Sequence, residues 1–177
     1  MGWTQFRLNE PVKDWFKRTW EEGGTKEVLD CALVKRSTMY GAIRVKETGE
    51  VFCAVFLIRW SREYYNFSYK DMTEHSGPCE RECPLRIMKL LTPLKNDDTF
   101  AKQWREDVYK FWEQKKIFNA TSAVIKTKEP VSFTNGQSYQ YFKKEGRRLW
   151  AGEMRNNMFF ALALVRVNLM KFELEKI

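Results

Sequence analysis

The sequence predicts an α+β fold, in which an antiparallel sheet with two packed helices precedes a small C-terminal β unit. Three observations predict this class. Segments between residues 28 and 69 are rich in β-branched and aromatic residues and are separated by short turns. Two segments between residues 84 and 118 have apolar residues at helical spacing. After residue 119 the apolar residues return to a period of two.

A short helix and four strands are predicted in the first part of the chain. The helix covers residues 11–20, has aromatic residues on one side, and is ended by Gly23 and Gly24. The strands cover residues 28–35, 39–45, 51–60 and 64–69. The third of these strands is almost entirely apolar, which is typical of a central strand covered on both faces.

Two helices follow these strands. The first opens at Pro84, whose missing N–H costs nothing in a first helical turn, and ends at Thr92 before Pro93. The second begins near residues 96–98, where Asn and Asp side chains can cap the helix and place negative charge at its positive end. Its aromatic and apolar residues then recur at intervals of three and four as far as Trp112.

The C-terminal part is predicted to consist mainly of strands, over residues 123–126, 131–133, 138–142, 147–151 and 171–175. Asn135 and Gly136 are a signal for a type I′ hairpin turn. Residues 158–167 fit either a buried strand or a short helix, and their Leu and Ala content favours the helix. The predicted domains are an α+β core over residues 1–118 and a basic β-rich unit over residues 119–177, packed on that core as one domain.

Positive charge is distributed unevenly along the 177 residues. The net charge is +8, and residues 101–177 carry 15 Lys and Arg against 8 Asp and Glu. This asymmetry indicates an anionic partner for the last part of the chain. No apolar run approaches the roughly 18 residues that a membrane helix needs, and the N-terminus has no signal-peptide pattern. The sequence therefore predicts a cytoplasmic protein without a membrane partner.

Cations and aromatic residues are interleaved around one predicted hairpin. We expect six of its residues to bind nucleic acid, with phosphate contacts from Lys143, Lys144, Arg147 and Arg148 and base stacking on Tyr141 and Trp150. Alternation along a strand places Tyr139 on the same face as Tyr141. The alternative is that the tyrosines and the tryptophan face the core, while the cations only keep a loop soluble.

The cysteines and the single histidine do not form a convincing chemical site. His75, Cys79 and Cys83 are spaced by four residues, but a zinc site needs four such ligands. Cys31 and Cys53 fall in predicted strands, where a thiol usually packs as a small hydrophobe. A Cys83–His75 nucleophile lacks an identifiable third partner, and the phosphate-loop and hydrolase motifs are missing from the sequence. We therefore expect no metal, no cofactor and no enzymatic activity.

Several short sequence motifs stand out, at residues 1–4, 65–72, 77–79, 83–84, 90–93 and 104–105. Together they resemble a family of uncharacterised proteins encoded by bacteriophages and mobile elements of gut Firmicutes, and the resemblance implies that the protein acts in a host bacterial cell. Ser68 and Ser76 depart from the family pattern, which has glycine and methionine there. The resemblance implies a small accessory protein that counters a host defence system. Its partner would be nucleic acid or a host nucleoprotein complex such as a CRISPR effector.

The sequence leaves other functions open beside a non-enzymatic nucleic-acid-binding inhibitor. One is a protein–protein interaction module that targets a host enzyme. Another is a sponge for a signalling nucleotide, with residues 64–75 as one wall of its pocket. A homodimer is compatible with each of these functions.

Overall fold

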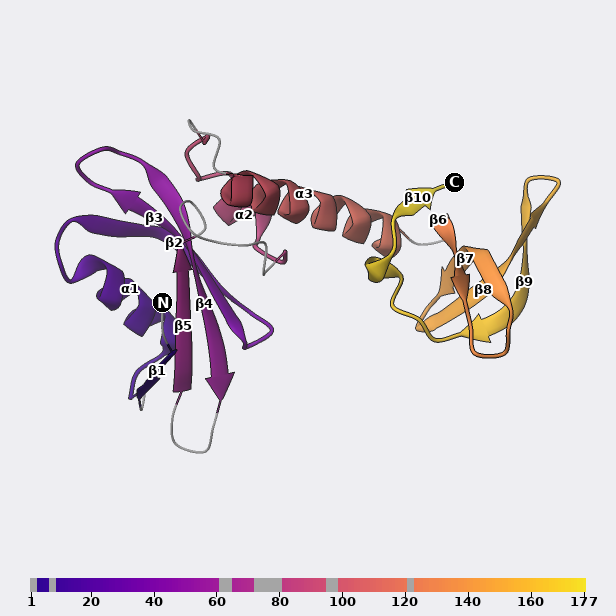
Figure 1. The fold of residues 1–177 in the computed structure, drawn as a ribbon, viewed down its shortest axis with the longest axis horizontal. Coiled ribbons are helices and arrows are strands. Elements are labelled where there is room, and N and C mark those ends of the chain that lie inside the picture. Colours follow the sequence, from indigo (N-terminus) through magenta and orange to yellow (C-terminus); the bar gives the residue numbers. More distant parts are fainter. Residues whose placement is uncertain (1–2, 7–8, 61–64, 72–80, 95–98, 121–122) are drawn as a thin grey trace. The chain divides into compact units, whose positions relative to one another are not determined.

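The computed structural model describes residues 3–6, 9–60, 65–71, 81–94, 99–120 and 123–177 (Figure 1). The chain forms two compact units, Met1–Tyr109 and Lys110–Ile177. The division falls inside helix α3 (Thr99–Asn119), whereas the sequence predicts a boundary after residue 118. Each unit contains one antiparallel five-stranded sheet, which confirms the predicted α+β class and the β-rich C-terminal part.

The first unit is built on a sheet with the strand order β1-β5-β4-β3-β2 (Figure 1). Its strands are β1 (Trp3–Phe6), β2 (Lys26–Val34), β3 (Thr38–Val45), β4 (Val51–Trp60) and β5 (Tyr65–Asp71). Strand β4 lies in the middle, and its residues 51–56 are all buried. The prediction of a central, doubly covered strand is therefore confirmed, whereas the edge strand β1 was not predicted.

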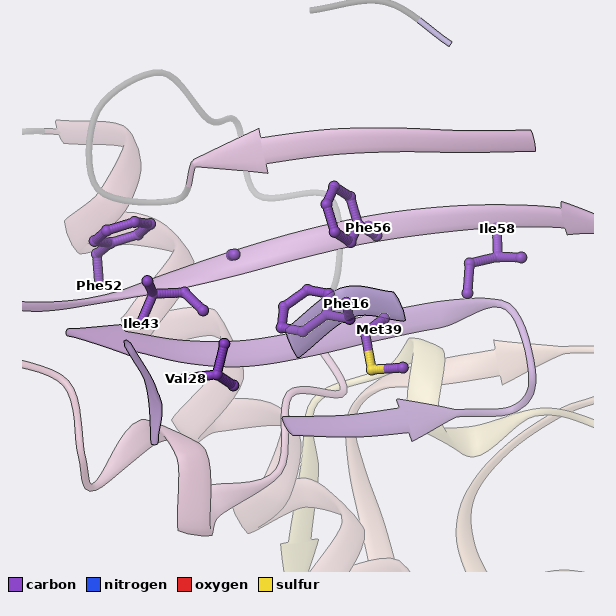
Figure 2. Close-up of a cluster of buried hydrophobic side chains, with 8 residues drawn as sticks. Phe16, Val28, Met39, Ile43, Phe52, Phe56 and Ile58 are labelled. Carbon is purple, nitrogen blue, oxygen red and sulfur yellow. The ribbon is translucent and has the colours of Figure 1, made fainter. Parts of the chain in front are cut away.

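Helix α1 (Val12–Glu21) packs its aromatic side on one face of this sheet. Phe16 is fully buried, and its ring centroid lies 5.1 Å from that of Phe56 in an edge-to-face arrangement. Figure 2 shows the Phe16 ring beside Phe56 and Met39. Gly41 permits this approach, because a Cβ atom there would lie only 2.4 Å from the Phe16 ring.

The segment around α2 (Leu85–Met88) contacts the same sheet through β3 and β4. The Thr92 N–H donates to the Val51 carbonyl at 3.0 Å, and the Val51 N–H donates to Thr92 Oγ1 at 2.8 Å. The helix is shorter than the predicted 84–92, since the last residues before Pro93 form a turn instead of a second helical turn. α3 is the predicted long helix, and Trp104 and Val108 are fully buried at its N-terminal half.

The second unit has the strand order β10-β6-β7-β8-β9. Its elements are β6 (Val124–Ser132), β7 (Ser138–Glu145), β8 (Arg148–Arg155), β9 (Met158–Val165), the 3₁₀ helix η1 (Leu169–Lys171) and β10 (Leu174–Lys176). Ile125, Phe142, Ala151 and Leu169 form its fully buried core, and the end of α3 packs against them. One face of the sheet is therefore covered by α3 and η1.

Residues 158–165 form a strand, so the predicted helix over residues 158–167 is wrong. Asn156 and Asn157 both have positive φ, at 49° and 61°, and Arg155 is the cross-strand partner of Met158. Two left-handed residues between paired strands are the signature of a type I′ turn. Asn tolerates this conformation better than most residues, so the turn returns the chain as a strand regardless of helix propensity.

Three other local predictions also need correction. The turn at Asn135 is not type I′, because only Gly136 has positive φ, at 81°. The Gly136 N–H donates to the Phe133 carbonyl at 3.0 Å, and the Phe133 N–H donates to the Gln137 carbonyl, as in a type I turn followed by a glycine bulge. The two predicted strands at 123–126 and 131–133 are one strand, β6, with an irregular pairing between them. β10 is shorter than the predicted 171–175 because Lys171 belongs to η1.

Across the described residues, no helix combines the length and the apolar character needed to cross a bilayer.

Candidate nucleic-acid interface

The sheet of the second unit separates a core face from an opposite face, which we call the outer face. Residues paired directly across strands point to the same side of a sheet, and consecutive residues point to opposite sides. Phe142 is the cross-strand partner of both Ile125 and Ala151, and all three are fully buried in the core. Their chain neighbours Lys143 and Trp150 are also partners, so they lie together on the outer face.

The register brings five basic and aromatic residues together on this outer face. Tyr141 is the cross-strand partner of Lys126 on one side and of Gly152 on the other. Arg148 precedes Trp150 by two residues in β8 and therefore shares its face. We call this set the basic–aromatic face; it consists of Lys126, Tyr141, Lys143, Arg148 and Trp150.

A tight turn connects the two strands that carry most of this face. Glu145 and Arg148 are cross-strand partners, and Gly146 at the first turn position has a φ of 58°. A glycine with positive φ at this position is typical of a type II′ hairpin, whose twist matches that of its strands. The turn places Arg147 at its tip, where the side chain is exposed.

Glu145 orients the tryptophan of the basic–aromatic face. The Trp150 indole N–H donates to Glu145 Oε2 at 3.1 Å. Trp150, Tyr141 and Lys143 are half-buried, while Arg148 is exposed. A half-buried indole held by a hydrogen bond is a restrained aromatic surface, which loses little conformational freedom when a ligand stacks on it.

Lys144, Arg147 and Tyr139 do not join the other predicted residues on this face. Lys144 points to the core side of β7, where its Nζ lies 4.1 Å from the centre of the Phe118 ring. Tyr139 packs against the core beside Phe133, beyond the irregular pairing of β6 with β7. Of the six residues proposed from the sequence, the structure thus brings together Tyr141, Lys143, Arg148 and Trp150. Lys126 is a further member that the sequence analysis missed, because only the β6–β7 register places it beside Tyr141.

The positive charge of the chain is concentrated in this unit. Residues 110–177 contain 13 Lys and Arg against 6 Asp and Glu, a net charge of +7. Within the described residues, Lys110 and Lys128 form ion pairs with Glu173, and Arg155 forms one with Glu153. These contacts partly neutralise the charge away from the β7–β8 hairpin.

The cations of the β7–β8 hairpin are less neutralised than the ion-paired cations elsewhere in the unit. In the part of the chain that the structure describes, Lys143, Arg147 and Arg148 make no ion pair, and Glu145 and Glu175 are acidic residues near the basic–aromatic face. The balance on this side of the hairpin is therefore positive, as a phosphate-binding surface requires.

The structure does not favour thiol or metal chemistry at Cys83. Its side chain is fully buried, and burial together with the neighbouring Cys53 thiol raises the pKa of Cys83. A thiol of raised pKa stays protonated, so it is neither a good nucleophile nor a good metal ligand. His75 and Cys79 lie outside the described residues, and no group of three potential metal-ligating side chains occurs within them.

Comparison with known proteins gives one partial match. Residues 95–161 match the model of a family described as Domain of unknown function (DUF6927). This segment runs from the start of α3 into β9 and includes all five residues of the basic–aromatic face. No curated protein and no solved structure matches the chain.

Proposed function

We propose that the protein binds single-stranded nucleic acid through the basic–aromatic face, without catalysing a reaction. The observation that carries the proposal is the position of Lys143 and Arg148 beside Tyr141 and Trp150 on the sheet face opposite the core. Cations supply contacts to phosphates, and aromatic rings supply surfaces on which bases stack. The concentration of net charge in the same unit supports an anionic partner.

A sheet surface favours single strands over a duplex. Reading duplex DNA requires an element that enters a groove, such as a helix or a two-stranded ribbon. The residues of the basic–aromatic face come instead from β6, β7 and β8, which lie side by side in the middle of a five-stranded sheet. Unpaired bases can lie on such a surface and stack on Tyr141 and Trp150, as they do on other sheet platforms.

The biological role that we propose is that of an accessory protein from a phage or mobile element. It would occupy a nucleic-acid strand or channel of a host nucleoprotein complex, such as a CRISPR effector. The family resemblance of the N-terminal motifs supports this role, and the basic–aromatic face supplies a surface able to compete for nucleic acid.

The two alternative functions, a protein–protein interaction module and a sponge for a signalling nucleotide, differ in their structural support. The edge strand β9 exposes large apolar side chains, which favours a protein interaction surface in the second unit. The proposed pocket wall for a signalling nucleotide, residues 64–75, lies partly outside the described residues.

The neighbouring residues Lys143 and Lys144 provide a matched test. They carry the same charge, but Lys143 lies on the basic–aromatic face and Lys144 lies over Phe118 on the core face. Binding of the full chain to a fluorescent single-stranded oligonucleotide would be measured by anisotropy over a series of salt concentrations. We expect Lys143→Ala to weaken binding and to reduce the salt slope by about 0.7, the value for one phosphate contact on a single strand.

Lys144→Ala is the control in this experiment, and it should leave both the affinity and the salt slope near those of the unsubstituted protein. Equal losses of affinity for the two substitutions would show that these lysines act only through the net positive charge of the unit and not through contacts on the basic–aromatic face. Absence of binding to any oligonucleotide at low salt would refute the proposed function.

A further inference from the structure

Strand β9 forms one edge of the C-terminal sheet. Within the described residues it pairs with β8 alone, so the backbone groups along its other side have no strand partner. The pairing contains an irregularity at Leu162, because Ala151 pairs with Ala163 while Gly152 pairs with Ala161. Such an edge offers a row of N–H and C=O groups to any extended chain that approaches it.

Apart from the irregularity at Leu162, this edge lacks the features that usually prevent strand association. Its eight residues, Met158–Val165, contain no charged residue, no proline and no glycine. The opposite edge of the same sheet, β10, has only three residues, including Glu175 and Lys176. The edge strand β2 of the first unit carries Lys26, Glu27 and Asp30. Short length and charge are common protections of sheet edges, and β9 has neither.

β9 also exposes four large apolar side chains. Met158 is 63% exposed, Phe160 41%, Leu162 54% and Leu164 57%. Their exposed area amounts to about 400 Å², if each side chain has a full surface of roughly 200 Å². Met158 and Phe160 lie on the core side of the sheet and Leu164 lies on the outer side beside Trp150, so β9 offers apolar side chains on both sides of its free edge. Exposed apolar side chains in this number commonly mark an interaction site.

We propose that β9 pairs with β9 of a second copy of this chain. The two strands would run antiparallel about a two-fold axis and join the two sheets into one sheet of ten strands. A two-fold interface requires a self-complementary surface, and a strand without charges satisfies this requirement because apolar residues meet apolar residues. A strand from an unrelated acidic protein would find no positive charge within β9 itself to recognise.

The interface expected from edge pairing is small. Pairing covers the facing strand backbones and the flanks of the exposed apolar side chains, because the side chains of a strand project above and below the sheet. Such an interface does not exceed the roughly 1,200 Å² at which specific and stable interfaces begin. We therefore expect a dissociation constant in the micromolar range rather than an obligate dimer.

Charge selects the register of the two strands. Arg155 and Arg166 lie just outside the ends of β9. A pairing centred between Ala161 and Leu162 places Phe160 opposite Ala163 of the second copy and Met158 opposite Val165, and the β8–β9 register puts both pairs on the core side of the sheet. Arginines of the two copies then do not face each other, and like charges directly across strands, which are destabilising, are avoided.

The two-fold symmetry of the proposed dimer also determines where the outer faces of the two copies lie. An antiparallel continuation of one sheet has its two-fold axis perpendicular to the sheet, so the outer faces of both copies lie on the same side. The two basic–aromatic faces would then form one extended surface. The dimer itself does not depend on nucleic-acid binding, because β9 contributes none of the residues of that face.

Sedimentation of the nuclease-treated full chain tests the proposal. The molar mass would be followed from about 1 to 100 µM, a range that brackets the micromolar constants expected for small interfaces. We expect the unsubstituted protein to pass from monomer to dimer, and Leu162→Lys to remain monomeric. The control is Leu90→Lys, which places the same charge at a leucine of the first unit that is 41% exposed and should still dimerise.

A second variant tests the register without weakening the edge. In the Phe160→Cys/Ala163→Cys double variant, the thiol introduced at position 160 faces the one at position 163 of the second copy, so mild oxidation should form a 160–163 intermolecular disulfide, identified by peptide mapping. Circular dichroism should show unchanged secondary structure in each variant. A chain that stays monomeric up to about 100 µM, or a Leu162→Lys variant that dimerises as well as the unsubstituted protein, would overturn the proposal.

Discussion

Gly152 is the residue whose substitution tests the C-terminal sheet most directly. An ideal Cβ atom built there lies 1.9 Å from the Phe160 carbonyl oxygen and 2.9 Å from the Phe159 ring. A carbon and a carbonyl oxygen normally approach no closer than about 3.3 Å, so the two backbones must separate by more than about 1 Å. The atom in the way is backbone of the paired strand, so a rotamer change cannot remove the clash.

The cost of Gly152→Ala follows from the pairing that would be lost. The strands are paired from Gly152 with Ala161 to Arg155 with Met158, and separation at the first pair weakens the ladder up to the turn. Losing two or three hydrogen bonds at about 1 kcal/mol each predicts a destabilisation of about 2–3 kcal/mol. The irregularity at Leu162 cannot absorb the methyl group, because the clash is with the carbonyl of Phe160 on the turn side of it.

The assay combines urea unfolding with amide hydrogen exchange. Gly152→Ala should lower the unfolding midpoint and speed exchange in β8 and β9, while exchange in the first unit stays unchanged. Gly23→Ala is the control, since a Cβ there finds only Thr25 Oγ1 at 4.0 Å. An unchanged midpoint together with full protection of residues 148–165 in Gly152→Ala would refute the close approach of the two strands.

Two further predictions concern the turn between β8 and β9 and the ion pairs of Glu173 in the same unit. Asn157→Val should destabilise the protein by about 1–2 kcal/mol in urea unfolding, because a β-branched residue resists the φ of 61°, whereas Asn157→Gly should be tolerated. Hydrogen bonds from Lys110 and Lys128 lower the pKa of Glu173 below its ordinary 4.5. Their contribution to stability should be present above pH 4.5 and be lost as the pH falls through the lowered pKa. Glu173→Gln should remove this part of the pH dependence of the melting temperature, and an identical pH profile would contradict it.

The candidate site could be predicted from the sequence only in part. The interleaving of Lys, Arg, Tyr and Trp around residue 146 identifies the β7–β8 hairpin as basic and aromatic. Which of the neighbouring lysines faces outward depends on the register with β6 and β8, and a shift of one residue exchanges the faces. Lys143 and Lys144 are equivalent by composition, yet one lies beside Trp150 and the other over Phe118.

The largest error in the predicted fold concerns β9. Its Leu and Ala content favours a helix, but Asn156 and Asn157 form a turn that returns the chain along β8. The local signal was present in the sequence as two consecutive asparagines, which tolerate positive φ. Helix propensity amounts to less than about 1 kcal/mol per residue and is overridden by strand pairing.

The sequence by itself determined the α+β class, the central strand β4, the long helix α3 and the concentration of positive charge near the C-terminal end, because these depend on composition and on local periodicity. Only the tertiary structure decided the membership of the basic–aromatic face, the burial of Cys83 against Cys53, and the exposure of β9 at a sheet edge. These features depend on which strands are neighbours and in what register, and such pairings join residues whose contact leaves no trace in local sequence.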